Sequence, residues 1–204
     1  MKKYIILIIS VILGLRVSAQ SAEDFLNKVI EKTKSYDDIS IIFNYQMINT
    51  GVGMYENFNG YASMKGNAYI LNIGGQELIS NGKILWTHLI DDEEVMISEV
   101  TEDNNNSPIA IVDSFTKNIT AEFITNDDTN ITTIEIKENE GNTFDRVHIS
   151  VDKDMNIKKV YVATPDGNEF IYEITDYKTN QNLPDSMFIF NKTLHPNVEV
   201  IDMR

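Results

Sequence analysis

The feature of this sequence that most restricts its fold is a long series of short segments in which β-branched and aromatic residues alternate with polar ones. Turn residues separate these segments at intervals of about ten residues, which is typical of antiparallel all-β domains. Ile39, Ile41, Phe43, Tyr45 and Met47, for example, would share one face of a strand. We expect an antiparallel sheet of about eleven strands, near residues 40–48, 57–64, 67–73, 76–80, 83–90, 93–100, 120–126, 130–137, 143–151, 156–163 and 168–177, with a short tail strand near 187–190.

One dipeptide, Asn81-Gly82, is the clearest turn signal in the chain. It lies between two predicted strands, 76–80 and 83–90, and it is the pair that most readily supplies the positive φ angles of a two-residue hairpin. The sequence therefore predicts a hairpin that reverses at Asn81 and Gly82.

Two segments carry helical patterns instead. Ser21 followed by Asp24 resembles a capping box, and apolar residues then recur at helical spacing, so we expect a helix that ends at about Ser35. Further along, Ser107 is a good N-cap and Pro108 suits the first helical position. This second predicted helix is short and strongly apolar, with Ile109, Val112, Phe115 and Ile119 at its core-facing positions.

Several predicted strands are apolar on both faces, as in Tyr69-Ile70-Leu71 and Ile84-Leu85-Trp86. Two helices cannot cover both faces of so large a sheet. Either the sheet curves strongly around a core, or the helices close a concave face that an apolar ligand fills.

The N-terminus has the pattern of an export signal. Lys2 and Lys3 precede an apolar stretch from Tyr4 to Leu15, and small residues lead to Ala19. The stretch is too short to cross a bilayer, which needs about twenty helical residues. We expect residues 1–19 to be a signal peptide cleaved after Ala19, which leaves a single domain at 20–204.

Charge and cysteine content exclude several classes of protein. The chain has 17 basic and 31 acidic residues, a net charge of -14, and no cysteine. Binding to nucleic acid or to an anionic lipid surface depends on clustered Lys and Arg, so neither is expected. Without cysteine, the chain cannot contain disulfides, and it cannot itself be lipidated at an N-terminal cysteine.

Nothing in the sequence predicts a catalytic or metal centre. His88, His148 and His195 lie far apart, without a carboxylate at ligand spacing, so we expect His88 and His148 to be exposed strand residues and His195 to lie in a turn. A nucleophile elbow and a P-loop are both missing. We therefore expect no enzymatic activity, no cofactor and no metal.

Two acidic motifs are interpreted as turns. Asp152–Asn156 begins like a calcium loop, but Ile157 and Ala163 stand where such a loop needs a glycine and a bidentate acid. The run 91–94 of four acidic residues fits a solvated hairpin end better than a catalytic carboxylate pair.

Several segments, taken in order, resemble the bacterial outer-membrane lipoprotein carrier family, LolA and its relatives. Residues 79–86, ISNGKILW, resemble the family hairpin SDGKTLW, and residues 60–71, GYASMKGNAYIL, resemble its pattern G-x-L-x-x-x-R-P-x-x-F-R-W. Ser107-Pro108 is similar to the start of the family's "TP" helix. Residues 188–190 with 196–202 resemble its closing F-x-F-x-P-P-x-G-V-x-V-x-D.

The resemblance implies an incomplete antiparallel β-barrel of about eleven strands, with helices forming a lid over an apolar cavity. In relatives this cavity shields the acyl chains of lipoproteins, which an inner-membrane ABC transporter supplies and which travel through the periplasm to the outer membrane, where there is a possible acceptor. A monomeric carrier is expected. The alternatives are a LolA-like paralogue that holds another lipid or a pigment precursor, and an envelope scaffold that binds no ligand.

The resemblance also suggests roles for particular residues. Lys65 aligns with the arginine that latches the lid in relatives, although lysine lacks the planar fork of arginine. Tyr69 aligns with the aromatic residue through which relatives dock on the transporter. The expected cavity lining, for which ordinary core packing is an equal alternative, consists of Phe43, Tyr45, Met47, Met64, Trp86, Ile109, Val112 and Phe115.

Overall fold

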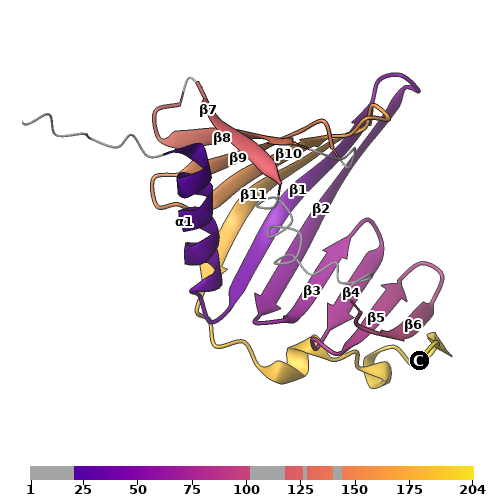
Figure 1. The fold of residues 1–204 in the computed structure, drawn as a ribbon. Helices are drawn as coiled ribbons and strands as arrows, with labels where there is room; N and C mark the ends of the chain where they lie inside the picture. Colours follow the sequence, from indigo (N-terminus) through magenta and orange to yellow (C-terminus); the bar gives the residue numbers. More distant parts are fainter. Residues whose placement is uncertain (1–20, 102–117, 126–127, 140–143) are drawn as a thin grey trace, which may run out of the picture.

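The computed structural model describes residues 21–101, 118–125, 128–139 and 144–204, which form one strongly bent sheet of twelve strands with an α-helix against it (Figure 1). The signal peptide with its cleavage site lies outside the described residues, and so does the second predicted helix up to residue 117. Ile119, which we expected at the end of that helix, is instead the first residue of a strand. Along the sheet the strands follow the order β12-β6-β5-β4-β3-β2-β1-β11-β10-β9-β8-β7. Their bounds are β1 Ile39–Asn49, β2 Met54–Lys65, β3 Ala68–Ile73, β4 Gln76–Ser80, β5 Ile84–Leu89, β6 Glu94–Glu99, β7 Ile119–Ile124, β8 Ile131–Glu138, β9 Arg146–Asp152, β10 Ile157–Ala163, β11 Glu169–Thr179 and β12 Glu199–Asp202.

The first predicted helix is confirmed as α1, Ala22–Lys34. The Ser21 hydroxyl oxygen accepts a hydrogen bond from the Asp24 backbone N–H at 3.1 Å, so Ser21 is the N-cap that the sequence predicts. The buried stripe of α1 includes Leu26 and Val29 and packs on β7, β8 and β9. None of the helices in the described ranges is long and apolar enough to cross a membrane.

The predicted strands agree with β1 to β11 to within a few residues, but the Asn81-Gly82 turn differs by one position. Ser80 pairs with Leu85, and the Asn81 N–H donates to the Ile84 carbonyl at 3.3 Å, so the two loop residues are Gly82 and Lys83. Gly82 has φ +83°, which glycine adopts without strain. The Asn81 side chain caps this loop, since its Oδ1 accepts from the backbone N–H of Lys83 and Ile84.

The prediction for the C-terminal end of the chain was wrong. Instead of a strand near 187–190, the chain forms a 3-10 helix, η1, at Asp185–Phe188, and a second one, η2, at Lys192–Leu194. Pro184 begins this turn, with its carbonyl accepting from the Met187 N–H at 3.0 Å. The last strand is β12, which pairs with β6 in parallel, so the otherwise antiparallel sheet has a parallel strand pair at one edge.

The expected incomplete barrel is confirmed as a mainly β fold whose sheet does not close, since β7 and β12 are its two ends. We call the face that packs on α1 the inner face, and the opposite one the outer face. Residues 180–198, here called the strap, cross the outer face of β3 to β5 below the sheet in Figure 1. The strap explains why these strands are apolar on both sides: Tyr69 and Leu71 face inward, whereas Ile70 packs under the strap with Phe188.

Candidate functional site

An aromatic cluster occupies the inner face where β1, β2 and β11 lie side by side. Tyr45 is its centre, with ring centroids 5.0 Å from Tyr172, 6.3 Å from Phe58 and 6.4 Å from Phe170. Phe43 extends the cluster, 6.0 Å from Tyr172. The β1–β2 and β1–β11 registers place these residues opposite one another, so alternation along three strands builds one continuous apolar surface.

Gly60 makes room for this surface. It pairs with Phe43 across β1 and β2, and a Cβ at Gly60 would lie 2.5 Å from the Phe43 ring and 2.7 Å from the Asn72 carbonyl oxygen. Phe43 is therefore 3% exposed because its ring lies over a residue without a side chain.

The other members of the cluster remain partly open to solvent. Phe58 is 38% exposed, and Tyr45, Tyr172 and Phe170 are intermediate in burial. Burial raises the pKa of Tyr172 to about 12, and the neighbouring Tyr45 adds to the shift. An apolar surface that stays partly uncovered on so acidic a chain is typical of a site that takes an apolar ligand or partner.

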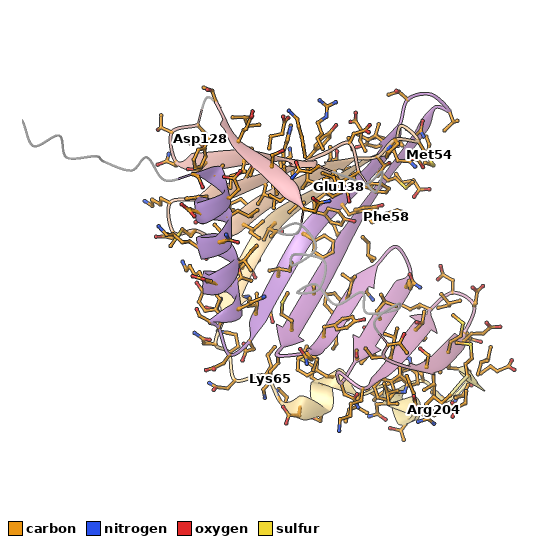
Figure 2. All side chains as sticks on the ribbon, viewed as in Figure 1. Met54, Phe58, Lys65, Asp128, Glu138 and Arg204 are labelled. Atoms are coloured by element: carbon orange, nitrogen blue, oxygen red, sulfur yellow. The ribbon has the colours of Figure 1, made fainter. Side chains whose placement is uncertain are left out.

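Met47 shares this face, since it pairs with Glu56 and Phe170 in the registers that bring Tyr45 opposite Phe58 and Tyr172. In Figure 2, Phe58 lies along the half of β2 that leads toward Met54, while Lys65 marks the opposite end of the strand. This part of the inner face thus brings together three of the expected lining residues, Phe43, Tyr45 and Met47. Ile109, Val112 and Phe115 lie outside the described residues, so the lid that they would form stays a prediction.

Met64 and Tyr69 lie further along the inner face, in a separate core cluster with Ile39 and Leu85. Tyr69 is 2% exposed, and burial raises the pKa of its hydroxyl. The side chain that the resemblance suggested for docking is therefore not accessible to a partner in this structure. Docking through Tyr69 would require Met64 and Leu85 to move away.

The prediction that Trp86 lines the same surface was wrong. Trp86 pairs with Ile79 and Ile97, whereas its neighbour Leu85 belongs to the inner cluster, so Trp86 points to the outer face. There it packs with Ile70 and Ile79, beneath the strap. The periodicity of a strand assigns its residues to two faces, but which face receives a cover depends on the strap, whose path no local pattern indicates.

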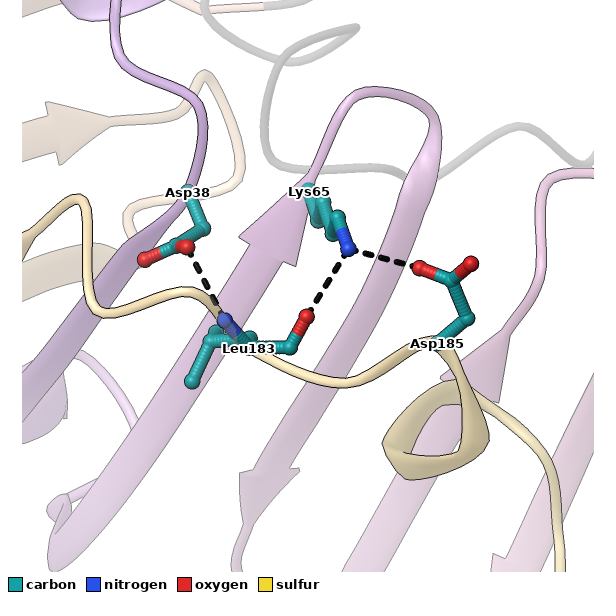
Figure 3. A network of polar contacts seen from close by, with 4 residues as sticks. All are labelled: Asp38, Lys65, Leu183 and Asp185. Atoms are coloured by element: carbon teal, nitrogen blue, oxygen red, sulfur yellow. Dashed lines mark hydrogen bonds and ion pairs between the residues drawn. The ribbon is translucent and has the colours of Figure 1, made fainter.

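Among the described residues, Lys65 holds the strap (Figure 3). The lid helix that it was expected to latch lies outside them, so that role stays a prediction. The Lys65 Nζ donates to the Leu183 carbonyl at 2.8 Å and pairs with the Asp185 carboxylate at 2.7 Å. On the other side, the Asp38 carboxylate accepts from the Gln181 N–H at 2.7 Å and the Leu183 N–H at 3.0 Å. Lys65 and Asp38 together fasten the beginning of the strap to the ends of β1 and β2.

Asp38 is buried, and the strap compensates its carboxylate for the loss of water. The residue is 2% exposed, and burial by itself raises the pKa of its carboxyl. The hydrogen bonds from the strap backbone, with the charge of Lys65, outweigh that effect, so the pKa is lowered overall.

The structure brings together two histidines that we expected to lie apart. His88 is 3% exposed, instead of an exposed strand residue, and its ring centroid lies 4.7 Å from that of His195 in the strap. His148 is partly buried, and its Nε2 is 2.8 Å from Glu135. Sequence spacing carries no signal for the pairing of His88 with His195, because only the path of the strap brings them close.

The sequence and the fold are both similar to those of known proteins. A model of the family described as "Outer membrane lipoprotein carrier protein LolA" matches residues 74–191. The outer-membrane lipoprotein carrier protein of Francisella philomiragia is 25% identical and covers 98% of each chain. That of Francisella tularensis is 26% identical over 89% of this chain and 90% of its own. An uncharacterized conserved protein from Thermus thermophilus has a TM-score of 0.57 at 9% identity, covering 87% of this chain and 96% of its own, which shows the fold alone.

Proposed function

Because the chain belongs to the outer membrane lipoprotein carrier family, LolA, we propose that it is an exported, non-enzymatic carrier that binds the acyl chains of lipoproteins on the inner face of its sheet. Residues 1–19 act as the signal peptide, cleaved after Ala19, and residues 20–204 form the carrier domain in the periplasm. The inner-membrane ABC transporter supplies the cargo, and an outer-membrane acceptor receives it.

The observation that carries this proposal is the partly open aromatic surface around Tyr45. Each methylene of an acyl chain taken out of water contributes about 0.8 kcal/mol, so long chains need a large apolar surface. Aromatic rings and the thioether of Met47 supply such a surface with few directional contacts. Few directional contacts suit a carrier, which has to release its cargo as well as bind it.

Alternation along β1 offers a matched test. The mature protein is mixed with a dansylated triacyl peptide, and binding is followed by fluorescence. Tyr45→Asp places a carboxylate within the aromatic cluster and should weaken binding by about tenfold or more, because a charge next to hydrocarbon is poorly solvated. Asn44→Asp changes the adjacent, partly exposed residue on the outer face and should leave binding unchanged.

Tyr45→Leu distinguishes the effect of the introduced charge from that of losing the tyrosine, since an apolar replacement should retain most of the acyl binding. Equal binding by Tyr45→Asp and Asn44→Asp, with native-like circular dichroism, would mean that the inner face does not hold the acyl chains. Val112→Asp and Phe115→Asp test the predicted lid in the same assay.

Native mass spectrometry of the purified mature protein identifies the cargo class. A bound triacyl peptide supports the lipoprotein carrier, and a smaller lipid or pigment precursor supports the paralogue instead. A protein with no ligand, which also takes up no hydrophobic dye, would be the scaffold.

A further inference from the structure

A second site lies on the outer face, on the other side of the sheet from the aromatic cluster. It is a pocket of about 420 Å³ between the strap and β4, β5 and the turn into β6. Glu77 comes from β4, His88 from β5, and His195 from the strap. The proposed function uses none of these residues.

Two polar atoms face each other in this pocket without a hydrogen bond between them. His88 is 3% exposed, and its Nδ1 has no hydrogen-bond partner within the described part of the chain. The nearby Oε2 of Glu77 lies 3.7 Å from Nδ1, which is too long for a hydrogen bond. The other oxygen of Glu77 accepts from the Tyr61 hydroxyl at 2.6 Å, so the carboxylate is held in place. With the ring proton of His88 on Nε2, Nδ1 is an acceptor, and an N–H donor placed between Nδ1 and Oε2 would satisfy both.

The surroundings of the pocket are acidic. Glu93 lines it from the β5–β6 turn and has a left-handed backbone, φ +53°, which is uncommon for a residue with a side chain. Its carbonyl accepts from the Glu199 N–H at 2.8 Å, which ties the turn to β12. The same turn contains Asp91 and Asp92, and Glu94 follows as the first residue of β6. No Lys or Arg is among the described residues that line the pocket. Lys192 of the strap donates to the Val198 carbonyl.

The rim is apolar and open. Ile90 is 41% exposed, and Leu194 is 72% exposed. An aliphatic stem could lie against this rim while its charged end reaches the acceptors below. Large exposed apolar side chains next to a charged pocket fit a macromolecular partner, which can cover them, better than a small solute.

From the unpartnered Nδ1 of His88, the Glu77 carboxylate beside it, the acidic surroundings and the apolar rim, we propose that this pocket receives a basic side chain, arginine or lysine, of a protein partner. Its N–H groups would bridge Glu77 and His88, and Glu93 would add to the attraction. A metal ion is a poorer fit, because no group of three or more His, Asp or Glu in the described residues could hold one.

The test uses N-acetyl-arginine amide as the probe and the ring signals of the three histidines, read by NMR on the mature protein. The signals of His88 and His195 should shift and saturate, while that of His148, which pairs with Glu135, should stay in place. Neutral N-acetyl-citrulline amide should produce no shift. Glu77→Gln should weaken binding of the arginine compound by about tenfold, the typical effect of losing one charge-assisted hydrogen bond.

Glu93→Gln provides a second variant and should weaken the probe less. Glu173→Gln, an exposed outer-face carboxylate that pairs with Lys159, is the matched control and should bind as the unmodified protein does. Equal binding of the citrulline compound, equal shifts of all three histidines, or full binding by Glu77→Gln would each overturn the proposal. Shifts with zinc ions but none with the arginine compound would reassign the pocket to a metal. Acyl binding, which takes place on the other face, should be unaffected in every variant, so the two proposals fail separately.

Discussion

Replacing Gly60 by alanine tests the close approach that forms the inner surface. The new Cβ would lie 2.5 Å from the Phe43 ring and 2.7 Å from the Asn72 carbonyl oxygen. The ring can turn away, but the carbonyl belongs to β3 and moves only if the strand moves. Overpacking a buried site costs about 1–3 kcal/mol, and with a ring and a backbone atom both obstructed we expect about 3 kcal/mol. For a domain of this size that lowers Tm by about 6–12 °C.

The assay is urea unfolding of the mature protein, together with binding of the dansylated triacyl peptide. Phe43→Leu by itself should cost about 1 kcal/mol, as do other swaps between large apolar residues. In the double variant the shorter side chain leaves space for the new methyl group, so the total cost should be at least about 1 kcal/mol below the sum of the two single costs. The Gly60→Ala variant should also bind the acyl probe more weakly, because the displaced ring enters the acyl surface.

Two results would refute this reasoning. The first is a Gly60→Ala variant as stable as the unmodified protein, which would mean that β1 and β2 are not in the register described here. The second is strict additivity of the two substitutions, which would mean that the ring and Gly60 do not share space.

The remaining predictions concern the strap. Because the folded-state pKa of Asp38 is lowered, its carboxylate stabilises the fold above its unfolded pKa, and this contribution is lost as pH falls through the folded value. The urea midpoint of Asp38→Asn should therefore fall less steeply on acidification than that of the unmodified protein. An unchanged slope would contradict this prediction. Lys65→Met should lower the free energy of unfolding by only about 0.5–1 kcal/mol, since the ion pair of Lys65 with Asp185 is exposed. It should nevertheless speed hydrogen exchange at the backbone amides of the strap, whereas Lys65→Arg should not. Trp86→Ala should cost about 3 kcal/mol without changing acyl binding; as Trp86 is the one tryptophan in the chain, strong quenching of its fluorescence by brominated acyl chains would show that it faces the ligand after all.

Local patterns in the sequence were sufficient for most of the secondary structure. The N-cap at Ser21 and the alternation along β1 depend on residues a few positions apart, so both could be recognised without knowledge of the fold. The hairpin turn was predicted at Asn81-Gly82, one residue before the observed loop of Gly82 and Lys83. Gly82 and the capping side chain of Asn81 both favour a reversal of the chain at this point, but they are compatible with either pair of loop residues. Only the pairing of Ser80 with Leu85 distinguishes them.

Part of the inner face could be predicted, where alternation on one strand was enough. Phe43, Tyr45 and Met47 were grouped correctly because they belong to a single strand. Trp86 was assigned to the wrong face, and the burial of Tyr69 was not expected, because their environments depend on segments far along the chain or on neighbouring strands. The buried state of His88 has the same origin, since His195 covers it from the strap.

The order of residues along the chain therefore decided which segments became strands, where the helix began, and which side chains each strand turned to a common face, because these properties arise from backbone geometry and hydrogen bonds between near neighbours. The three-dimensional arrangement decided which face of the sheet stayed open and which one the strap covered. It also decided which carboxylate binds the strap backbone and which histidine is buried. Those outcomes depend on the burial of surfaces that meet only after the chain has bent, and no interval in the sequence encodes them.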